Sequence, residues 1–343
     1  MNGLILQGGS SKGGWQCGLL KAISEITGDS TVPFRSISGI SVGAINASVL
    51  AMEKQNFRKG VLRLENYWTN MSHENVYDLG KYGVLSSLNN ILSKNNSRSY
   101  LFNNTPLKKF LSSKLDFDKL QMLSEKKENP CFLNIHSFNY KTGNNEIFTN
   151  SNLNSKLYTN RTKLNLNHIL ASTGIPFVFP STKINKTNYG DGGLKLSTPS
   201  QILIEQGCKR ILGISLDENE LTNDCNASFM LNTVFPDALS DDFAKIQNKN
   251  ESTKWYKPFN KYKEVEKLLI RPNLEIENAP KDRNKDLPFS LKHAINLLGL
   301  GKTESSNILN YISFDKEYSI YLIEEGYRQG LKMEREIANF LKP

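Results

Sequence analysis

The sequence predicts an α/β fold with a mostly parallel central sheet and helices on both of its faces. Short apolar strands alternate with segments of helical periodicity over the first third of the chain, and a glycine-containing turn joins each of the first two strands to the next helix. Strands that alternate with helices at this spacing form parallel sheets. Of the 343 residues, 38% are hydrophobic, which suffices for a sizeable core.

The first four elements follow directly from the pattern. Residues 4–6 are a short apolar strand that stops at a pair of glycines, and apolar residues then recur at helical spacing over residues 15–23. Residues 34–38 are a second strand, and helical spacing resumes over residues 42–52. Two strand-to-helix turns are therefore expected near the N-terminus.

The later elements are less regular. Residues 57–128 have the pattern of a helical insertion, with breaks at residues 93–98 and around Pro106, which suits the first position of a helix that Thr105 caps. Residues 217–260 look like a loose, Asn-rich insertion. The other expected elements are strands at residues 131–138, 147–148, 211–216 and 267–270, a turn at residues 141–144 and a helix over residues 320–341.

The charge and targeting signals limit the function classes. The chain carries 43 Lys and Arg against 34 Asp and Glu, and this net charge of +9 favours anionic partners. No basic and aromatic stripe accompanies the charge, so a nucleic-acid partner is not expected. No run reaches the roughly 18–20 apolar residues of a membrane-spanning helix, and the N-terminus lacks the pattern of a signal peptide.

The cysteines and the missing signal peptide favour a cytoplasmic protein. The four cysteines lie far apart without a Cys-x-x-Cys pair, which argues against a zinc site and a disulfide scaffold and favours a reducing compartment. Export as an effector by a route without an N-terminal signal stays an open alternative.

A glycine-rich loop follows the first strand. Gly8 and Gly9 lead through Ser10 to Lys12 and Gly13 at the start of the helix. Glycines before a helix suit anions, because backbone N–H groups and the helix dipole both attract negative charge. The dinucleotide fingerprint needs a glycine at the third place of this run, where Ser10 stands, and no acidic residue about 20 positions on ends a second strand. No nucleotide cofactor is therefore expected.

The second turn reads Gly39-Ile40-Ser41-Val42-Gly43. The pattern Gly-x-Ser-x-Gly between a strand and a helix is typical of a nucleophile elbow, in which the turn forces the serine into a strained, exposed position. The helix N-terminus beside it favours an oxyanion. The sequence therefore predicts that Ser41 is a nucleophile.

Four blocks in this order resemble the patatin-like phospholipase family. The glycine-rich loop and the elbow are the first two. The third, residues 171–180, is similar to the family's Ala-Ser-x-x-x-Pro-x-x-Phe-x-Pro stretch, and the fourth is Asp191-Gly192-Gly193, which alone would indicate only a surface turn. The motif-level resemblance covers about residues 3–216.

The resemblance implies a lipid acyl hydrolase of the phospholipase A or lysophospholipase type, with a Ser-Asp dyad and neither metal nor cofactor. Ser41 would attack the acyl carbonyl, and Asp191 would accept its proton and pass it to the leaving alcohol. Backbone amides around Gly8, Gly9 and Ser10 would form the oxyanion hole. Water would then release the acyl group from the serine.

The resemblance also sets the expected organisation and partners. It implies a catalytic core over residues 1–216, with its motifs within about residues 4–205, and a C-terminal extension over residues 217–343 that completes the same domain. Lys12 and Gly13 would support the oxyanion loop. The substrate would be a phospholipid or another acyl-ester lipid, so peripheral association with an anionic membrane is expected. A protein or small-molecule activator is left open.

Two features of the expected site carry an energetic cost. Ser10 replaces the last glycine of the family's triple-glycine run, and a serine there is strained by about 1 kcal/mol if the position needs a positive φ. Asp is also a weaker base than His by roughly 2.6 pKa units, or about 3.5 kcal/mol. Burial of Asp191 beside Gly192 and Gly193 would raise its pKa and recover part of that difference.

Two other interpretations of the elbow are open. A Ser-His-Asp esterase or transacylase would use His293, since the order Ser41, Asp191, His293 is that of α/β-hydrolase triads. His136 is expected to pack in its strand, and His168 comes close to the third block in sequence. A lipid-binding effector with a vestigial dyad is the second interpretation.

Two helical faces are candidates for contact with an anionic membrane, although packing against the sheet is the simpler explanation for each. The first comprises Leu107, Phe110, Leu111 and Leu115, with Lys108, Lys109 and Lys114 between them. The second comprises Leu291, Ala294, Ile295 and Leu298, beside Lys292 and Lys302.

Overall fold

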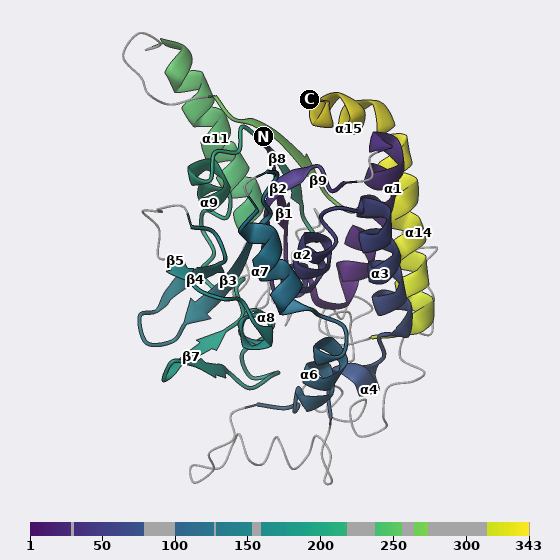
Figure 1. The fold of residues 1–343 in the computed structure, drawn as a ribbon, viewed down its shortest axis with the longest axis vertical. Helices are drawn as coiled ribbons and strands as arrows, with labels where there is room; N and C mark the ends of the chain where they lie inside the picture. Colours follow the sequence, from purple (N-terminus) through teal and green to yellow (C-terminus); the bar gives the residue numbers. More distant parts are fainter. Residues whose placement is uncertain are drawn as a thin grey trace, which may run out of the picture.

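The computed structural model describes residues 1–28, 31–78, 100–126, 128–152, 159–217, 237–255, 264–273 and 314–342. In this part of the chain, nine strands form one sheet in the order β5-β4-β3-β2-β1-β8-β9, and β6 and β7 add a hairpin beside β3 (Figure 1). The strands are β1 (Asn2–Leu6), β2 (Phe34–Ile40), β3 (Phe132–Asn139), β4 (Asn144–Thr149), β5 (Thr159–Arg161), β6 (Thr182–Ile184), β7 (Thr187–Gly190), β8 (Arg210–Ile214) and β9 (Glu266–Ile270).

The centre of the sheet is parallel. The run from β9 through β8, β1 and β2 to β3 pairs in parallel throughout, while β3 pairs with β4 and β7 in the antiparallel sense. In the central pair, Leu4 of β1 lies opposite Ile37 of β2 and Leu212 of β8. The four C-terminal residues of β1 are all buried, because helices cover both faces of a parallel sheet.

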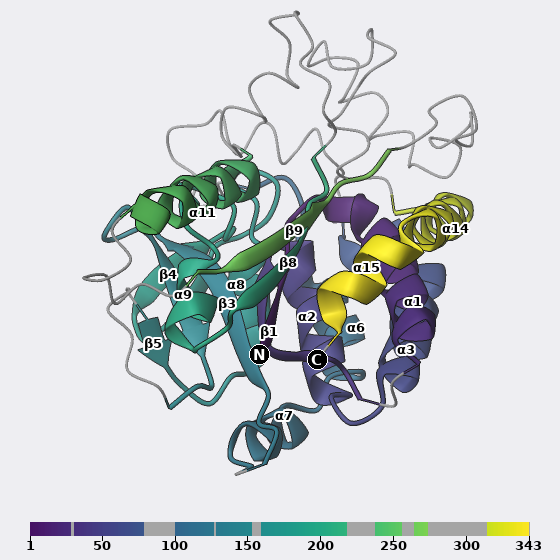
Figure 2. The ribbon, with the colours of Figure 1, turned by 90° about the horizontal axis from the view of Figure 1, so that it is seen from above.

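Helices cover both faces of the sheet, as predicted. Figure 2 shows α1, α3 and α14 on one side of the strands and α9 and α11 on the other. The helices are α1 (Gly13–Thr27), α2 (Val42–Met52), α3 (Phe57–Asn70), α4 (His73–Val76), α6 (Thr105–Ser112), α7 (Phe117–Ser124), α8 (Leu166–Ser172), α9 (Gln201–Glu205), α11 (Ala238–Trp255), α14 (Lys316–Lys332) and α15 (Glu334–Leu341).

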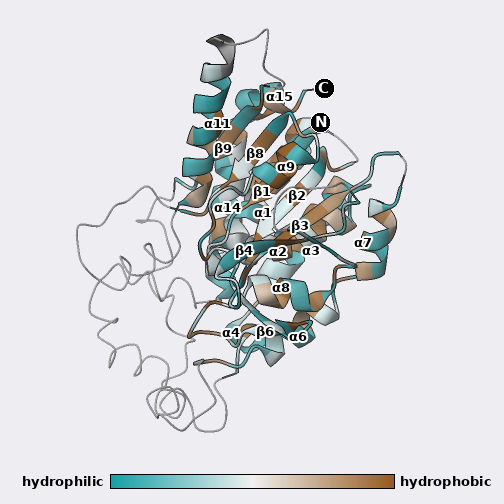
Figure 3. Cartoon of the chain, turned by 90° about the vertical axis from the view of Figure 1, so that its left-hand side faces the viewer, coloured by the Kyte–Doolittle hydropathy of each residue, from teal (hydrophilic) through white to brown (hydrophobic). Residues whose placement is uncertain are grey.

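The helix that follows the predicted nucleophile is the most deeply placed. Every residue of α2 is buried, because α2 lies between the sheet and the outer helices α1 and α3. A helix that is apolar on all sides requires such a position. Figure 3 shows the same layering, with hydrophobic residues on the central strands and hydrophilic residues on the outer side of α11. Ser41 is therefore attached to the most constrained helix of the fold.

One expectation about an individual segment is wrong. Within residues 217–260, expected to be a loose insertion, α11 is an ordered helix, because Leu239, Phe243 and Ile246 recur at helical spacing and pack in a hydrophobic core. Leu107 and Leu111 of α6 are buried in the main core, which agrees with packing, the simpler of the two explanations for this face.

Two further expectations concern spans of the membrane and the second helical face. Within the described residues, no helix combines the length and the apolar character that crossing a membrane requires. The second candidate face for a membrane, at residues 291–298, lies outside the described residues, as does His293.

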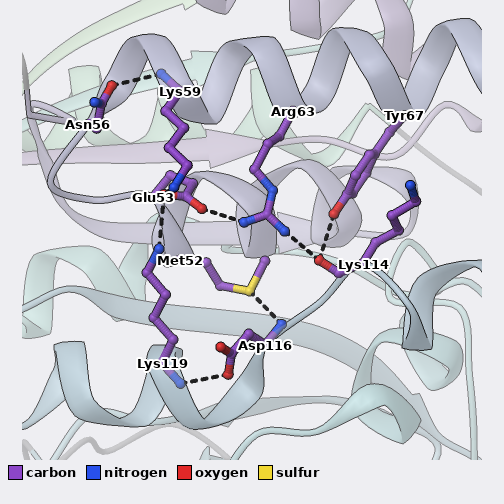
Figure 4. Close-up of polar contacts among 9 residues, drawn as sticks. All are labelled: Met52, Glu53, Asn56, Lys59, Arg63, Tyr67, Lys114, Asp116 and Lys119. Atoms are coloured by element: carbon purple, nitrogen blue, oxygen red, sulfur yellow. Dashed lines mark hydrogen bonds and ion pairs between the residues drawn. The ribbon is translucent and has the colours of Figure 1, made fainter.

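A buried ion cluster fixes the end of α2 that lies away from Ser41 (Figure 4). Glu53, only 3% exposed, accepts hydrogen bonds from Arg63 of α3 and from Lys119 of α7, the latter at 2.9 Å. The Nη2 atom of Arg63 also donates to the carbonyl oxygen of Lys114 at 2.6 Å. Burial opposes ionisation of Glu53, but the hydrogen bonds from Lys119 and Arg63 outweigh it and hold its pKa below the ordinary value.

Replacing Glu53 with alanine is expected to destabilise the protein by about 1–3 kcal/mol at pH 7. The lower part of the usual range for a buried pair applies, because both cations are about one third exposed and regain water. A lowered pKa in the folded state stabilises the protein above the ordinary pKa of Glu, near 4.3, and this contribution is lost as the pH falls further. Urea unfolding of wild type, Glu53→Ala and Glu53→Gln at pH 7 and at pH 3 measures both effects. Equal differences at the two pH values would contradict the account.

Candidate active site

Ser41 occupies a strained turn between β2 and α2. Its backbone has φ 52° and ψ −125°, outside the regions that a residue with a Cβ ordinarily adopts. The turn is tight because Gly43 lies against β1, where an added Cβ would be 2.0 Å from the carbonyl oxygen of Leu6. The Ser41 N–H donates to the hydroxyl of Ser172 at 3.0 Å. These features have the geometry of the predicted elbow.

Asp191 follows β7 and is brought to the elbow by backbone hydrogen bonds. Its N–H donates to the carbonyl oxygen of Gly174 at 3.0 Å, and the N–H of Gly192 donates to that of Ser172 at 3.1 Å. Gly192 is required for close approach, since an added Cβ would be 2.1 Å from the carbonyl oxygen of His136. The third and fourth sequence blocks therefore meet directly beside Ser41.

The carboxyl group of Asp191 is buried, with an exposed fraction of 1%. Burial raises its pKa to about 7, against the opposing effects of the Gly193 N–H and of the Ser41 hydroxyl. The Gly193 N–H donates to Oδ1 at 2.8 Å, whereas Oδ2 has no hydrogen bond of ordinary geometry within the described residues. Hydrogen bonds between catalytic groups are often long before substrate binds. A carboxyl group with a pKa near 7 is a much stronger base than an ordinary Asp.

One pocket of about 430 Å³, open solvent at its mouth included, contains the predicted catalytic groups. Ser41 and Asp191 line it together with Gly8, Gly9, Gln7 and Asp217. Gly8 lies directly against the nucleophile, because an added Cβ would be 2.8 Å from the Cβ of Ser41. The structure therefore brings the predicted nucleophile, the predicted base and the first two glycines of the loop into one space.

The remaining loop residues, from Ser10 to Gly13, do not line this pocket. Ser10 begins a short 3-10 helix, Ser10–Lys12, and its φ of 50° lies in the left-handed region, which for a serine costs about 1 kcal/mol. The Lys12 N–H donates to the carbonyl oxygen of Gly9 at 3.1 Å. Gly13 is required by packing, because an added Cβ would be 2.2 Å from the Trp68 ring. Lys12 and Gly13 do not line the pocket of Ser41 and Asp191.

A second, mostly apolar pocket also opens at Ser41. Ser41 and Ile175 line both spaces. The second pocket is lined by apolar side chains from α2, α4 and α6 and from the segments beside them. They include Val42, Ile45, Met71, Val76, Leu107 and Phe179. Ser41 therefore lines two spaces, and of the two only the one that contains Asp191 also has carboxyl groups in its wall.

A buried polar network joins α2 to the glycine-rich loop after β1. The side chain of Asn46, one turn after Ser41, donates to Oε1 of Gln16 at 2.9 Å and accepts from the Trp68 indole N–H at 3.0 Å. The Nε2 atom of Gln16 in turn donates to the backbone carbonyl oxygen of Gln7 at 2.9 Å. Gln7 immediately precedes Gly8. The network therefore sets the position of the loop relative to the helix of the nucleophile.

Replacing Asn46 with alanine is expected to destabilise the protein by about 2–4 kcal/mol, because Gln16 and Trp68 would lose their partners in the core. The matched control is Asn70→Ala, at an exposed position of α3, where we expect a change within about 0.5 kcal/mol. Chemical denaturation of the two variants measures the difference. Wild-type stability of Asn46→Ala would contradict the role given to the network.

None of the three described histidines lines either pocket at Ser41. His168 caps its own helix through a hydrogen bond from the Asn165 N–H to Nδ1, and burial lowers its pKa to about 4. His136 is buried beside Asn145, and burial lowers its pKa to about 4 as well. His73 lies at the start of α4.

The described residues contain no group of three or more His, Cys, Asp and Glu side chains that could hold a metal ion. Cys17, Cys131 and Cys208 are all buried and form no disulfide.

Three residues at the site of Ser41 and Asp191 could not be predicted from the sequence. Ser172, Gln16 and Asp217 reach the site through contacts between residues far apart in the chain, and no local pattern indicates them. Ser172 alone lies within a recognised block, residues 171–180, although nothing in that block distinguishes it from its neighbours.

The fold and the site define an α/β protein with an elbow-like turn at the carboxyl end of β2, a central strand of the parallel sheet. A family profile described as Patatin-like phospholipase matches residues 4–204, more than half of the chain. The chain belongs to the patatin-like phospholipase family.

Among solved structures, the chain is similar to VipD from Legionella pneumophila, with 16% sequence identity and a TM-score of 0.36 over 94% of this chain. The chain spans 66% of the length of that structure. No curated protein sequence matches the chain.

Proposed function

We propose that this protein hydrolyses the acyl esters of phospholipids or related lipids through a dyad of Ser41 and Asp191. The observation that carries the proposal is the position of a buried carboxyl group, with a pKa near 7, in the same pocket as a serine on a strained strand-to-helix turn. A base with that pKa is half ionised near neutral pH, where it can both accept and return a proton.

The reaction would proceed in two halves. Asp191 takes the hydroxyl proton as the Ser41 oxygen attacks the acyl carbonyl carbon, and it gives this proton to the departing alcohol when the ester bond breaks. Water then attacks the acyl-serine with Asp191 as the base, which releases the fatty acid and restores Ser41. The backbone N–H groups of Gly8, Gly9 and Ser10 would stabilise the negative charge on the carbonyl oxygen in both halves.

The two pockets support a lipid as the substrate. The second pocket at Ser41 offers the acyl chain an apolar space, and the pocket with the carboxyl groups of Asp191 and Asp217 accommodates the alcohol. Because Asp191 must protonate the leaving oxygen, the alcohol has to lie on the side of Asp191. The acyl chain then enters the other space.

The net charge of +9 supports peripheral association of the protein with an anionic membrane surface in the cytoplasm. The substrate would be taken from that surface. A requirement for an activator is tested in the assay below by adding a cell extract.

The experiment measures fatty acid released from mixed anionic and zwitterionic vesicles, with and without the extract. The proteins compared are wild type, Ser41→Ala, Asp191→Asn and His293→Ala. We expect activity in wild type and His293→Ala, and losses of about 10²–10⁴-fold or more in the other two. Loss in a folded His293→Ala would replace the dyad with a triad. No release by wild type under either condition would favour the lipid-binding effector.

A further inference from the structure

The alcohol side of the proposed site contains a second carboxyl group. Asp217 follows the end of β8 and lines the same pocket as Ser41 and Asp191. Its Oδ2 atom accepts a hydrogen bond of 2.5 Å from Nε2 of Gln7, and its N–H donates to the hydroxyl of Ser215 at 3.0 Å. The mechanism above gives Asp217 no task.

The hydrogen bond from Gln7 to Asp217 decides which hydrogen-bonding groups these two residues offer to a ligand in the pocket. Gln7 is 7% exposed, and its Nε2 donates to Asp217, so the amide group of Gln7 is held against the carboxylate. Asp217 itself only accepts when it is ionised. The group that Asp217 offers the pocket is therefore an acceptor, which calls for a donor on the ligand.

The charges around Asp217 keep it largely ionised at neutral pH. Burial and the nearby Asp237 raise its pKa to about 6, and the Gln7 amide, Lys12 and Arg271 oppose this rise. Arg271 is also paired with Asp237. The carboxylate thus persists at pH 7 with one strong hydrogen bond from a neutral amide, and it can accept further donors.

We propose that Asp217 binds the alcohol part of the substrate and selects esters whose alcohol carries a further hydrogen-bond donor, either a hydroxyl or an ammonium N–H. This inference rests on the proposed function, since it assigns the alcohol to the pocket of Asp191. An apolar alcohol would displace water from Asp217 and leave the hydrogen bonds of that water unreplaced. Sites built around a buried polar group discriminate strongly against ligands that lack the matching group.

The test uses two pairs of octanoate esters. The two members of each pair share the acyl chain and differ only in whether the alcohol part carries a hydrogen-bond donor. The hydroxyl pair is 1-octanoylglycerol and propyl octanoate. The ammonium pair is 2-(dimethylamino)ethyl octanoate, which carries one N–H when protonated, and 3-methylbutyl octanoate, which has carbon in place of nitrogen. The ratio of kcat/KM within each pair isolates recognition of the alcohol from acyl transfer, which both members share.

Wild type is expected to prefer the donor-bearing ester of at least one pair by about tenfold or more, and Asp217→Asn to reduce that ratio by about tenfold. The pair that responds identifies the donor as hydroxyl or ammonium. Asp118→Asn, an exposed Asp paired with Lys163 on the surface, is the matched control and should keep the wild-type ratios. If thermal melting shows that Asp217→Asn is unfolded, Asp217→Ser replaces it.

Two outcomes would overturn the inference in distinguishable ways. Wild-type ratios in an active Asp217→Asn, or a wild type without preference in either pair, would refute the role of Asp217 and leave the dyad intact. If wild type hydrolyses none of the four esters faster than Ser41→Ala does, the proposed function and the inference are both refuted.

Discussion

Asp191→Asn is expected to lower kcat/KM by about 10²–10⁴-fold and, at the same time, to make the protein more stable above pH 7. The loss follows because the amide cannot accept the proton of Ser41. In wild type, kcat/KM should rise with pH and level off above an apparent pKa near 7, the value that burial gives Asp191. A pKa near 4 would instead indicate an ordinary, hydrated carboxyl group.

The gain in stability follows from the same shift in pKa. In the unfolded chain Asp191 ionises near pH 3.9, but in the folded protein it stays protonated up to about pH 7. A group whose pKa is raised by folding stabilises the protein below the unfolded pKa, and this contribution is lost as the pH rises to the folded value. The shift of about 3 units at 1.36 kcal/mol each sets an upper bound of about 4 kcal/mol.

The measurement is thermal and urea unfolding of wild type and Asp191→Asn between pH 4 and pH 8.5. We expect the advantage of the variant to grow up to about pH 7, to roughly 2–4 kcal/mol, and to stay constant above it. Asp118→Asn, at an exposed position, should track wild type at every pH. A difference in stability that does not change with pH would show that ionisation of Asp191 does not destabilise the folded protein.

Gly8→Ala is expected to lower kcat by about 10²–10³-fold on a soluble ester while the protein still folds. An added Cβ would lie 2.8 Å from the Cβ of Ser41 and 3.4 Å from the carbonyl oxygen of Ile40. Such short contacts would force either the loop or Ser41 to move. The N–H groups of the loop would then no longer reach the oxyanion. The cost in stability should be about 1–3 kcal/mol, as for other overpacked sites.

The matched control is Gly213→Ala in β8. Its added Cβ would also be 2.8 Å from a neighbour, in this case a ring atom of Phe243, and Gly213 does not line either pocket at Ser41. We expect a similar loss of stability in the two variants, measured by urea unfolding, and a loss of kcat only in Gly8→Ala. Equal kcat values in the two variants would mean that the loop does not have to approach Ser41 this closely.

The parts of the fold that follow from local patterns could be predicted from the sequence. The elbow needs a strand, a small-residue turn and a helix in direct succession, and all three are visible around Ser41. The strained serine of the loop could also be anticipated, and Ser10 does adopt a positive φ. Such features depend on residues that are neighbours in the chain, so the sequence alone contains the necessary signal.

What could not be predicted depends on contacts between distant segments. The face of α6 has the same amphipathic pattern whether it meets a membrane or the core, and only the packed structure decides for the core. The sequence does not predict the helix α11, because most of its residues are polar, although Leu239 and Phe243 keep the helical spacing. Asp217 reaches Gln7 across 210 residues, and no pattern in the sequence links the two.

The assignment of Ser41 and Asp191 is tested most directly by covalent labelling with a fluorophosphonate, which reacts with activated serines. After digestion, mass spectrometry locates the adduct. The account predicts one adduct on the peptide that contains Ser41, none in Ser41→Ala, labelling at least about 100-fold slower in Asp191→Asn, and an unchanged rate in His168→Ala. An adduct on a different serine, or equally fast labelling of Ser41 in Asp191→Asn, would contradict it.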